Sequence, residues 1–171
     1  MATRAANVPA ARQTGGTVTL HFEDLAPGQT YDLGSVTIDE TEMFEFARRF
    51  DPQPFHVDPV AAKDTPFGGI IASGWYTGSL FMRMYADAVL SNAASHGSPG
   101  CEEMRWLSPI RAGDVLRGWV TVFDVQPSSK RPDRGTAFML GEFLRDGEAV
   151  FRIRYRGYFG RRKAATGRGS G

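Results

Sequence analysis

Two side chains that could exchange protons stand five residues apart in the chain, at Asp51 and His56. Pro52 and Pro54 lie between them and restrict the backbone, so we expect the carboxylate and the imidazole to be held in a nearly fixed relation. A rigid pair of this kind can act as general acid and base toward a bound reactant. Asp58 is followed by another proline, which is typical of a helix cap rather than a catalytic group.

A glycine-rich stretch follows this pair and offers backbone donors. Gly68 and Gly69 precede an apolar run, and Gly74 stands where a helical apolar pattern begins. The first N–H groups of a helix have no acceptor within it, and a glycine lets a ligand approach the backbone closely. We therefore predict that the Gly74 N–H can bind a developing oxyanion.

The helix that would position Asp51 is marked at both ends. Asp39 can cap its start, with Glu42 at the third helical position, and Pro52 keeps the residue before it out of the helical conformation. Asp51 would then lie at the helix C-terminus, where the macrodipole and unpaired carbonyl groups disfavour negative charge. We expect the pKa of Asp51 to be raised.

The remaining pattern predicts one long helix and several strands. Apolar residues repeat at helical spacing from 75 to about 90. Strand patterns cover residues 31–37, 102–107, 115–125, 136–144 and 149–159. Asp146-Gly147 marks a tight turn between the last two strands, and residues 126–135 are expected to form a loop. This order predicts an α+β fold in which an antiparallel sheet covers one helix.

Length and composition exclude several classes of protein. The chain has 171 residues, 42% of them apolar, which suits one domain with a substantial core. A net charge of +1 predicts no nucleic-acid partner. A single cysteine, Cys101, fits a reducing compartment, which predicts a cytoplasmic protein. No apolar run approaches the roughly 20 residues of a membrane span, and the three scattered histidines predict no metal site.

The chain is expected to form one folded domain with disordered ends. Residues 1–16 are small and polar without acidic side chains, and residues 161–171 are rich in glycine, arginine and alanine. Such segments cannot bury enough apolar surface to order themselves. The domain is therefore predicted to span residues 17–160.

The motif residues resemble those of the MaoC-like family, the (R)-specific enoyl-CoA hydratases and acyl dehydratases of the hot-dog fold. The family motif runs Asp-x-Asn-Pro-x-His-x-Asp, followed by Phe-Gly-x-x-Ile-Ala-His-Gly. The matching positions here are Asp51, Gln53, Pro54, His56 and Asp58, then Phe67, Gly68, Ile71, Ala72, Ser73 and Gly74. Gln53 replaces the usual asparagine, Ser73 replaces the usual histidine, and Met82 stands where some members carry a pocket serine. A weaker similarity extends over most of residues 18–160 and includes the run from Ser108 to Asp114, which resembles the family's turn after the first strand past the helix.

This resemblance implies a single hot-dog domain, its sheet wrapped around one long central helix, that hydrates a 2-enoyl thioester or dehydrates a 3-hydroxyacyl thioester. It implies acyl-CoA as the substrate, no metal or redox cofactor, and a homodimer with the acyl pocket near the subunit interface. Asp51 and His56 would be catalytic, with Gly74 as the oxyanion donor. The expected substrate-binding residues are Gln53, Pro54, Phe67, Gly68, Ile71, Ser73 and Met82.

Three alternatives stay open at this point. A hot-dog thioesterase would need a carboxylate on or beside the long helix, which offers only Asp87. A non-catalytic acyl-binding protein would keep the fold without turnover. The arginines of the last strand are interpreted as a solvated sheet face, and the alternative is that some of them meet the phosphates of coenzyme A. The residues concerned are Arg152, Arg154 and Arg156, with Lys130 and Arg131 in the preceding loop.

Overall fold

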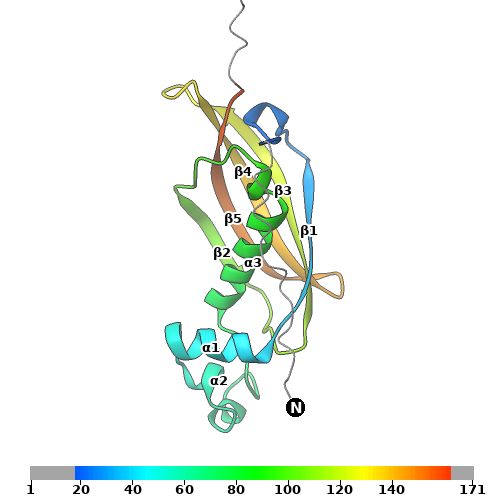
Figure 1. The fold of residues 1–171 in the computed structure, drawn as a ribbon. Helices are drawn as coiled ribbons and strands as arrows, with labels where there is room; N and C mark the ends of the chain where they lie inside the picture. Colours follow the sequence, from blue (N-terminus) through cyan, green and yellow to red (C-terminus); the bar gives the residue numbers. More distant parts are fainter. Residues whose placement is uncertain (1–17, 163–171) are drawn as a thin grey trace, which may run out of the picture.

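A five-stranded antiparallel sheet curves around one long helix in the computed structural model, which describes residues 18–162 (Figure 1). This arrangement confirms the predicted hot-dog fold. The strands are β1 (Thr30–Thr37), β2 (Gly100–Trp106), β3 (Val115–Pro127), β4 (Arg134–Arg145) and β5 (Glu148–Gly160). The helices are α1 (Glu40–Phe50), α2 (Pro54–Val57) and α3 (Gly74–Ala88), with 3-10 turns at Phe22–Asp24, Ala61–Asp64 and Leu90–Asn92.

The strands follow the order β1-β3-β4-β5-β2 across the sheet, so β1 and β2 form its two edges. The predicted turn between β4 and β5 is confirmed, and both of its residues have positive φ, 53° at Asp146 and 85° at Gly147. The long loop expected over 126–135 is shorter, because β3 continues to Pro127 and β4 begins at Arg134.

The core lies between α3 and the inner face of the sheet. Phe81 of α3 packs against the rings of Phe143 and Phe151, with ring centroids 5.5 and 5.7 Å away. Gly141 of β4 lies directly beneath Phe81, and a Cβ atom there would overlap its ring. The absence of a side chain at Gly141 therefore lets the helix lie close to the sheet.

The starts of α1 and α3 are capped by side chains. Asp39 Oδ1 accepts a hydrogen bond from the Glu42 N–H at 2.9 Å, which confirms the predicted cap of α1. Ser73 Oγ accepts one from the Trp75 N–H at 3.2 Å and so caps α3. As Figure 1 shows, α1 and α2 lie together beyond the end of the sheet at which α3 begins. The residues predicted to do chemistry therefore gather at that end.

Two residues of the predicted tail contact the folded part of the chain. Arg161 and Arg162 pair with Glu23 and Asp24, with shortest N–O distances of 2.9 and 2.6 Å, so these two residues of the predicted tail are held against the turn at Phe22–Asp24. The predicted leader over 1–16 and the rest of the predicted tail lie outside the described residues.

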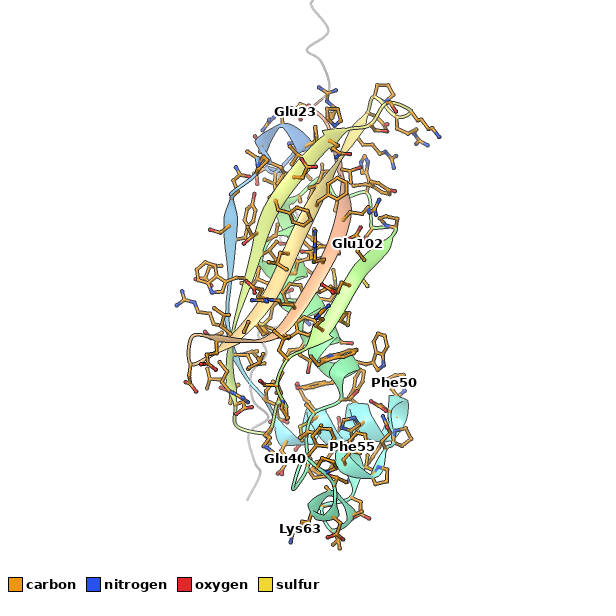
Figure 2. The ribbon with its side chains drawn as sticks, turned by 180° about the vertical axis from the view of Figure 1, so that it is seen from behind. Glu23, Glu40, Phe50, Phe55, Lys63 and Glu102 are labelled. Carbon is orange, nitrogen blue, oxygen red and sulfur yellow. The ribbon has the colours of Figure 1, made fainter. Side chains whose placement is uncertain are left out.

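Figure 2 shows the outer face of the sheet, and the arginines of β5 lie on this face because they alternate along the strand with the buried residues Phe151 and Tyr155. Arg152 pairs with Glu142 at 2.7 Å and Arg156 pairs with Glu102 at 2.6 Å. Arg154 lies over the ring of Phe123, 5.0 Å from its centroid. These contacts agree with the interpretation of a solvated sheet face. Within residues 18–162, no helix is both long and apolar enough to cross a membrane.

Candidate active site

Asp51, His56 and Gly74 line one cavity of about 380 Å³. Asp51 is the residue that ends α1, His56 lies in the short helix α2, and Gly74 is the first residue of α3. Three separate elements therefore bring together the groups that the sequence predicted to act together.

The geometry of His56 fixes which ring nitrogen faces Asp51. Its side chain is buried, and Nδ1 lies 2.8 Å from the carbonyl oxygen of Ile71. Because a carbonyl oxygen can only accept, we assign a proton to Nδ1. The other nitrogen, Nε2, faces Asp51 Oδ2 at 3.3 Å and is the one that can gain or lose a proton.

The carboxylate of Asp51 is held by two further side chains. The Ser73 hydroxyl donates to Oδ2 at 2.7 Å, and the Gln53 amide donates to Oδ1 at 2.7 Å. Burial is the largest single influence on the pKa of Asp51 and raises it, but the hydrogen bonds from Ser73 and Gln53 and the charge of a protonated His56 together outweigh burial. The pKa of Asp51 is therefore lowered, and the predicted rise was wrong.

The loop that supplies the acceptor for His56 is fixed from both sides. Ile71 N donates to the carbonyl oxygen of Phe55 at 3.1 Å. The Arg111 guanidinium donates to the carbonyl oxygens of Phe67 and Ile70 at 2.5 and 2.7 Å. Because these bonds restrain the backbone on each side of the Ile71 carbonyl group, the orientation of the imidazole ring is set by the backbone and not by the cavity contents.

Gly74 is covered by an aromatic side chain. The Trp106 indole Nε1 donates to the Gly74 carbonyl oxygen at 2.8 Å, and a Cβ atom at Gly74 would overlap the indole ring. The N–H of Gly74, at the first position of α3, has no acceptor inside the helix. A residue other than glycine would therefore displace the cavity wall next to this donor.

The predicted substrate-binding residues divide into two groups. Gln53, Phe67 and Ile71 line the cavity. Pro54, Gly68, Ser73 and Met82 are not among the residues that line it. Ser73 is fully buried at 0% exposure, and Met82 lines a separate cavity of about 280 Å³ beside Tyr85 and Cys101.

The remaining wall comes from residues that were not predicted to bind the substrate. They are Ala72, Trp75, Thr77, Trp106, Leu107, Ser108, Pro109 and Ile110. The last three belong to the run from Ser108 to Asp114 that resembles a family turn. This resemblance was the sequence feature from which their place at the site could have been predicted. Ala72 N donates to the Ile110 carbonyl oxygen at 2.7 Å, which brings this run against the glycine-rich loop.

Groups named in the alternative interpretations lie elsewhere. Asp87 is paired with Arg83 at 2.7 Å near the far end of α3 and does not line the cavity. The arginines of β5 do not line it either. Among residues 18–162, no three histidine, cysteine or acidic side chains are placed to hold a metal ion.

Comparison with known proteins places these features in a family. Residues 22–137 match the family model described as MaoC like domain. Over 136 residues the chain is 29% identical to a 3-hydroxybutyryl-CoA dehydratase of Methylorubrum extorquens, an alignment that covers 78% of this chain and 84% of that protein. It is 28% identical over 139 residues to an (R)-specific enoyl-CoA hydratase of Rhodospirillum rubrum, covering 80% and 94% of the two chains.

Two solved structures are also similar to this chain. A crystal structure of a MaoC-like dehydratase from Rhodospirillum rubrum matches with a TM-score of 0.76 and 35% identity, covering 85% of this chain and all of that one. The structure of a monoamine oxidase regulatory protein from Archaeoglobus matches with a TM-score of 0.77 and 26% identity, covering 86% and 99% of the two chains.

Proposed function

The chain belongs to the MaoC like domain family, and on that premise we propose that it is a hydratase that adds water to a 2-enoyl thioester or removes it in the reverse reaction. The observation that carries this proposal is the pair of Asp51 and His56, with Oδ2 and Nε2 3.3 Å apart on the wall of the cavity. The names of two relatives, a dehydratase and an (R)-specific hydratase of acyl-CoA substrates, favour acyl-CoA as the substrate and the (R) product.

The reaction needs a base for the water that attacks C3, a proton for C2 and donors for the charge that develops on the thioester oxygen. A water that lies beside the pair and hydrogen-bonds to both Asp51 Oδ2 and His56 Nε2 meets the first need. The lowered pKa of Asp51 keeps its side chain ionised at neutral pH, so that the carboxylate can accept a hydrogen bond from this water, and the pair as a unit takes up its proton. The pair returns one proton to C2, so that the enzyme ends unchanged, while the Gly74 N–H binds the thioester oxygen.

No observation favours thioester hydrolysis. The one acidic side chain of α3 that could serve as its base, Asp87, pairs with Arg83 and lies outside the cavity. A non-catalytic acyl-binding protein would not need a carboxylate and an imidazole aimed at each other beside a free backbone donor. The dyad therefore weighs against both alternatives.

We further propose that the enzyme is a cytoplasmic homodimer. Two tryptophans at the cavity are largely exposed, Trp75 at 60% and Trp106 at 46%. Trp106 belongs to β2, an edge strand whose outer backbone groups have no partner within the described sheet. A second copy that covered this edge would bury both rings and close the cavity from water.

The proposal is tested by replacing each member of the pair. Positioned acid–base groups contribute about 10²–10⁴-fold, so Asp51→Asn and His56→Ala should each lower kcat on trans-2-enoyl-CoA by at least roughly 100-fold. Asp58→Asn is the matched control, because Asp58 Oδ1 caps a turn by accepting from the N–H groups of Val60 and Ala61 and does not line the cavity. Near-normal turnover in either dyad variant would refute the assignment.

A further inference from the structure

The two positions at which the chain departs from the family motif beside the dyad both contact Asp51. Gln53 donates to Oδ1 and Ser73 donates to Oδ2, each at 2.7 Å. Gln53 lines the cavity, but Ser73 is fully buried and does not. A reactant in the cavity cannot touch Ser73, so the predicted role of this residue in substrate binding needs a different interpretation.

The two hydrogen bonds of the Ser73 hydroxyl group fix its orientation. Its oxygen accepts from the Trp75 N–H at 3.2 Å, at the start of α3, while its proton is donated to Asp51 Oδ2. The same Oδ2 atom faces His56 Nε2. A single hydroxyl group therefore connects the dyad, which is carried by α1 and α2, to the helix whose first N–H belongs to Gly74.

We propose that Ser73 is a positioning residue that holds Asp51 Oδ2 at a fixed place relative to both His56 and the start of α3. The role of Ser73 in the reaction rests on the function proposed above. Its role in fixing the Asp51 carboxylate does not depend on that function. The base and the oxyanion donor act on atoms of one substrate, so their separation must be fixed, and the Ser73 hydroxyl is the direct link between them.

A capping role alone would not require a hydroxyl at this position. A helix cap needs only an acceptor, and aspartate or asparagine serves equally well. The contact with Asp51 needs a donor as well, and an aspartate at residue 73 would repel the carboxylate. Serine and threonine combine the acceptor and the donor in one atom. The residue type thus fits the double contact better than it fits the cap.

The bond also acts on the charge of Asp51. A hydrogen bond donated to a carboxylate stabilises its ionised form. Loss of the Ser73 hydroxyl should therefore raise the pKa of Asp51, because burial, which already raises that pKa, would be opposed by fewer donors.

The test compares Ser73→Ala and Ser73→Thr with wild type, using Asp39→Ala as the matched control. Asp39→Ala removes the corresponding side-chain cap from α1 and lies outside the cavity. The first readout is the titration of the Asp51 carboxyl carbon by NMR in ¹³C-labelled protein, with the signal assigned from Asp51→Asn. The second readout is the pH dependence of kcat/KM on a trans-2-enoyl-CoA.

Ser73→Ala should move the Asp51 titration and the acid limb of kcat/KM to higher pH. It should also lower kcat about tenfold or more, with KM changed by no more than about twofold, because misplacement of the base affects the chemical step more than binding. Ser73→Thr should restore both readouts, and Asp39→Ala should leave both unchanged. If Ser73→Ala does not fold, Ser73→Cys, which is similar in size and a poor donor, takes its place.

An unchanged Asp51 titration in folded Ser73→Ala would overturn the proposal, as would an equal loss of kcat when the substitution is made in the Asp51→Asn background. In that background, substitution of a residue that acts through Asp51 should lower kcat little further. The NMR readout does not depend on turnover. A wild type without hydratase activity would therefore refute the proposed reaction, while the titration would still decide the role of Ser73.

Discussion

At Asp51, local hydrogen bonds have a larger effect on the pKa of the carboxyl group than the dipole of helix α1 has. Its place at the end of α1 led us to expect a raised pKa, because a helix C-terminus disfavours negative charge by about 0.3–1 kcal/mol. Hydrogen bonds to charged groups are worth about 1.5–3 kcal/mol each, and Asp51 accepts them from both Ser73 and Gln53. The sequence motif contains both donors, but it does not reveal that they converge on one carboxylate.

The lowered pKa of Asp51 predicts how stability depends on pH. A carboxyl group whose pKa is lower in the folded state stabilises the fold above its unfolded pKa of about 3.9, and this contribution is lost as pH falls through the folded pKa. The difference in free energy of unfolding between wild type and Asp51→Asn should therefore be largest near neutral pH and shrink between about pH 4 and the folded pKa. Urea unfolding of both proteins over this range measures it.

Asp58→Asn again serves as the comparison, since the pKa of Asp51 should not respond to it. A difference between wild type and Asp51→Asn that stayed constant as the pH was lowered would contradict the lowered pKa.

At the scale of elements, periodicity and capping signals predicted most of the fold. The cap at Asp39, the stop before Pro52 and the apolar spacing from residue 75 located α1 and α3 to within about two residues. The start of β2 was missed by two residues, because it begins with Gly100 and Cys101 and contains a register shift between Cys101 and Glu103. Glycine and a bulge weaken the alternation that marks a strand.

Only the cavity residues that lie within the motif were predictable from the sequence. Asp51 and His56 lie close together in the chain, and the glycine at the start of the next helical pattern added Gly74, which the structure places with them. The opposite wall comes from Trp106 and the run after β2, more than 30 residues away from Gly74 in the chain. Long-range packing of this kind leaves no periodic signal in one sequence. The family resemblance implied a substrate-binding role for Met82, whereas Met82 lines a separate cavity.

Two glycines of α3 give a matched test of how tightly the helix start fits. A Cβ atom at Gly74 would overlap the Trp106 indole, whereas one at Gly78 would meet Met104 Cε at 3.5 Å, an ordinary contact. Gly74→Ala should therefore displace the cavity wall and lower kcat/KM by about 100-fold, the cost of a misplacement of roughly 1 Å. Gly78→Ala should keep activity and raise the free energy of unfolding by about 0.5–1 kcal/mol.

Steady-state kinetics and urea unfolding of the two variants provide the measurements. Full activity in Gly74→Ala would mean that Trp106 can move away without consequence, and the fixed relation between Gly74 and the cavity wall would be wrong.

At the scale of the whole molecule, three of the exposed large apolar side chains belong to α3 and β2. Trp75 and Trp106 lie there with Met82, which is 47% exposed, and β2 is an edge of the sheet. Figure 2 shows the opposite, outer face, where Glu102 marks β2 at the sheet edge. We therefore predict a dimer at micromolar concentration in sedimentation velocity experiments, formed on the side of α3 and β2.

A charged residue on that side should weaken the dimer. Met82→Lys, which lies outside the catalytic cavity, is expected to shift the protein toward monomer. Val115→Lys is the control, because Val115 is also an exposed apolar residue but begins β3, next to the opposite edge strand β1. A wild-type monomer, or equal effects of the two substitutions, would count against this interface.

The central claim, that Asp51 and His56 hydrate an enoyl thioester, is tested most directly by following two signals in one reaction. Wild type and Asp51→Asn are each mixed with a short panel of trans-2-enoyl-CoAs, while the absorbance of the conjugated thioester and the release of free thiol are recorded. We predict that wild type removes the conjugation without releasing thiol and that Asp51→Asn does neither. Thiol release by wild type, or hydration by the variant at the wild-type rate, would contradict the proposed function.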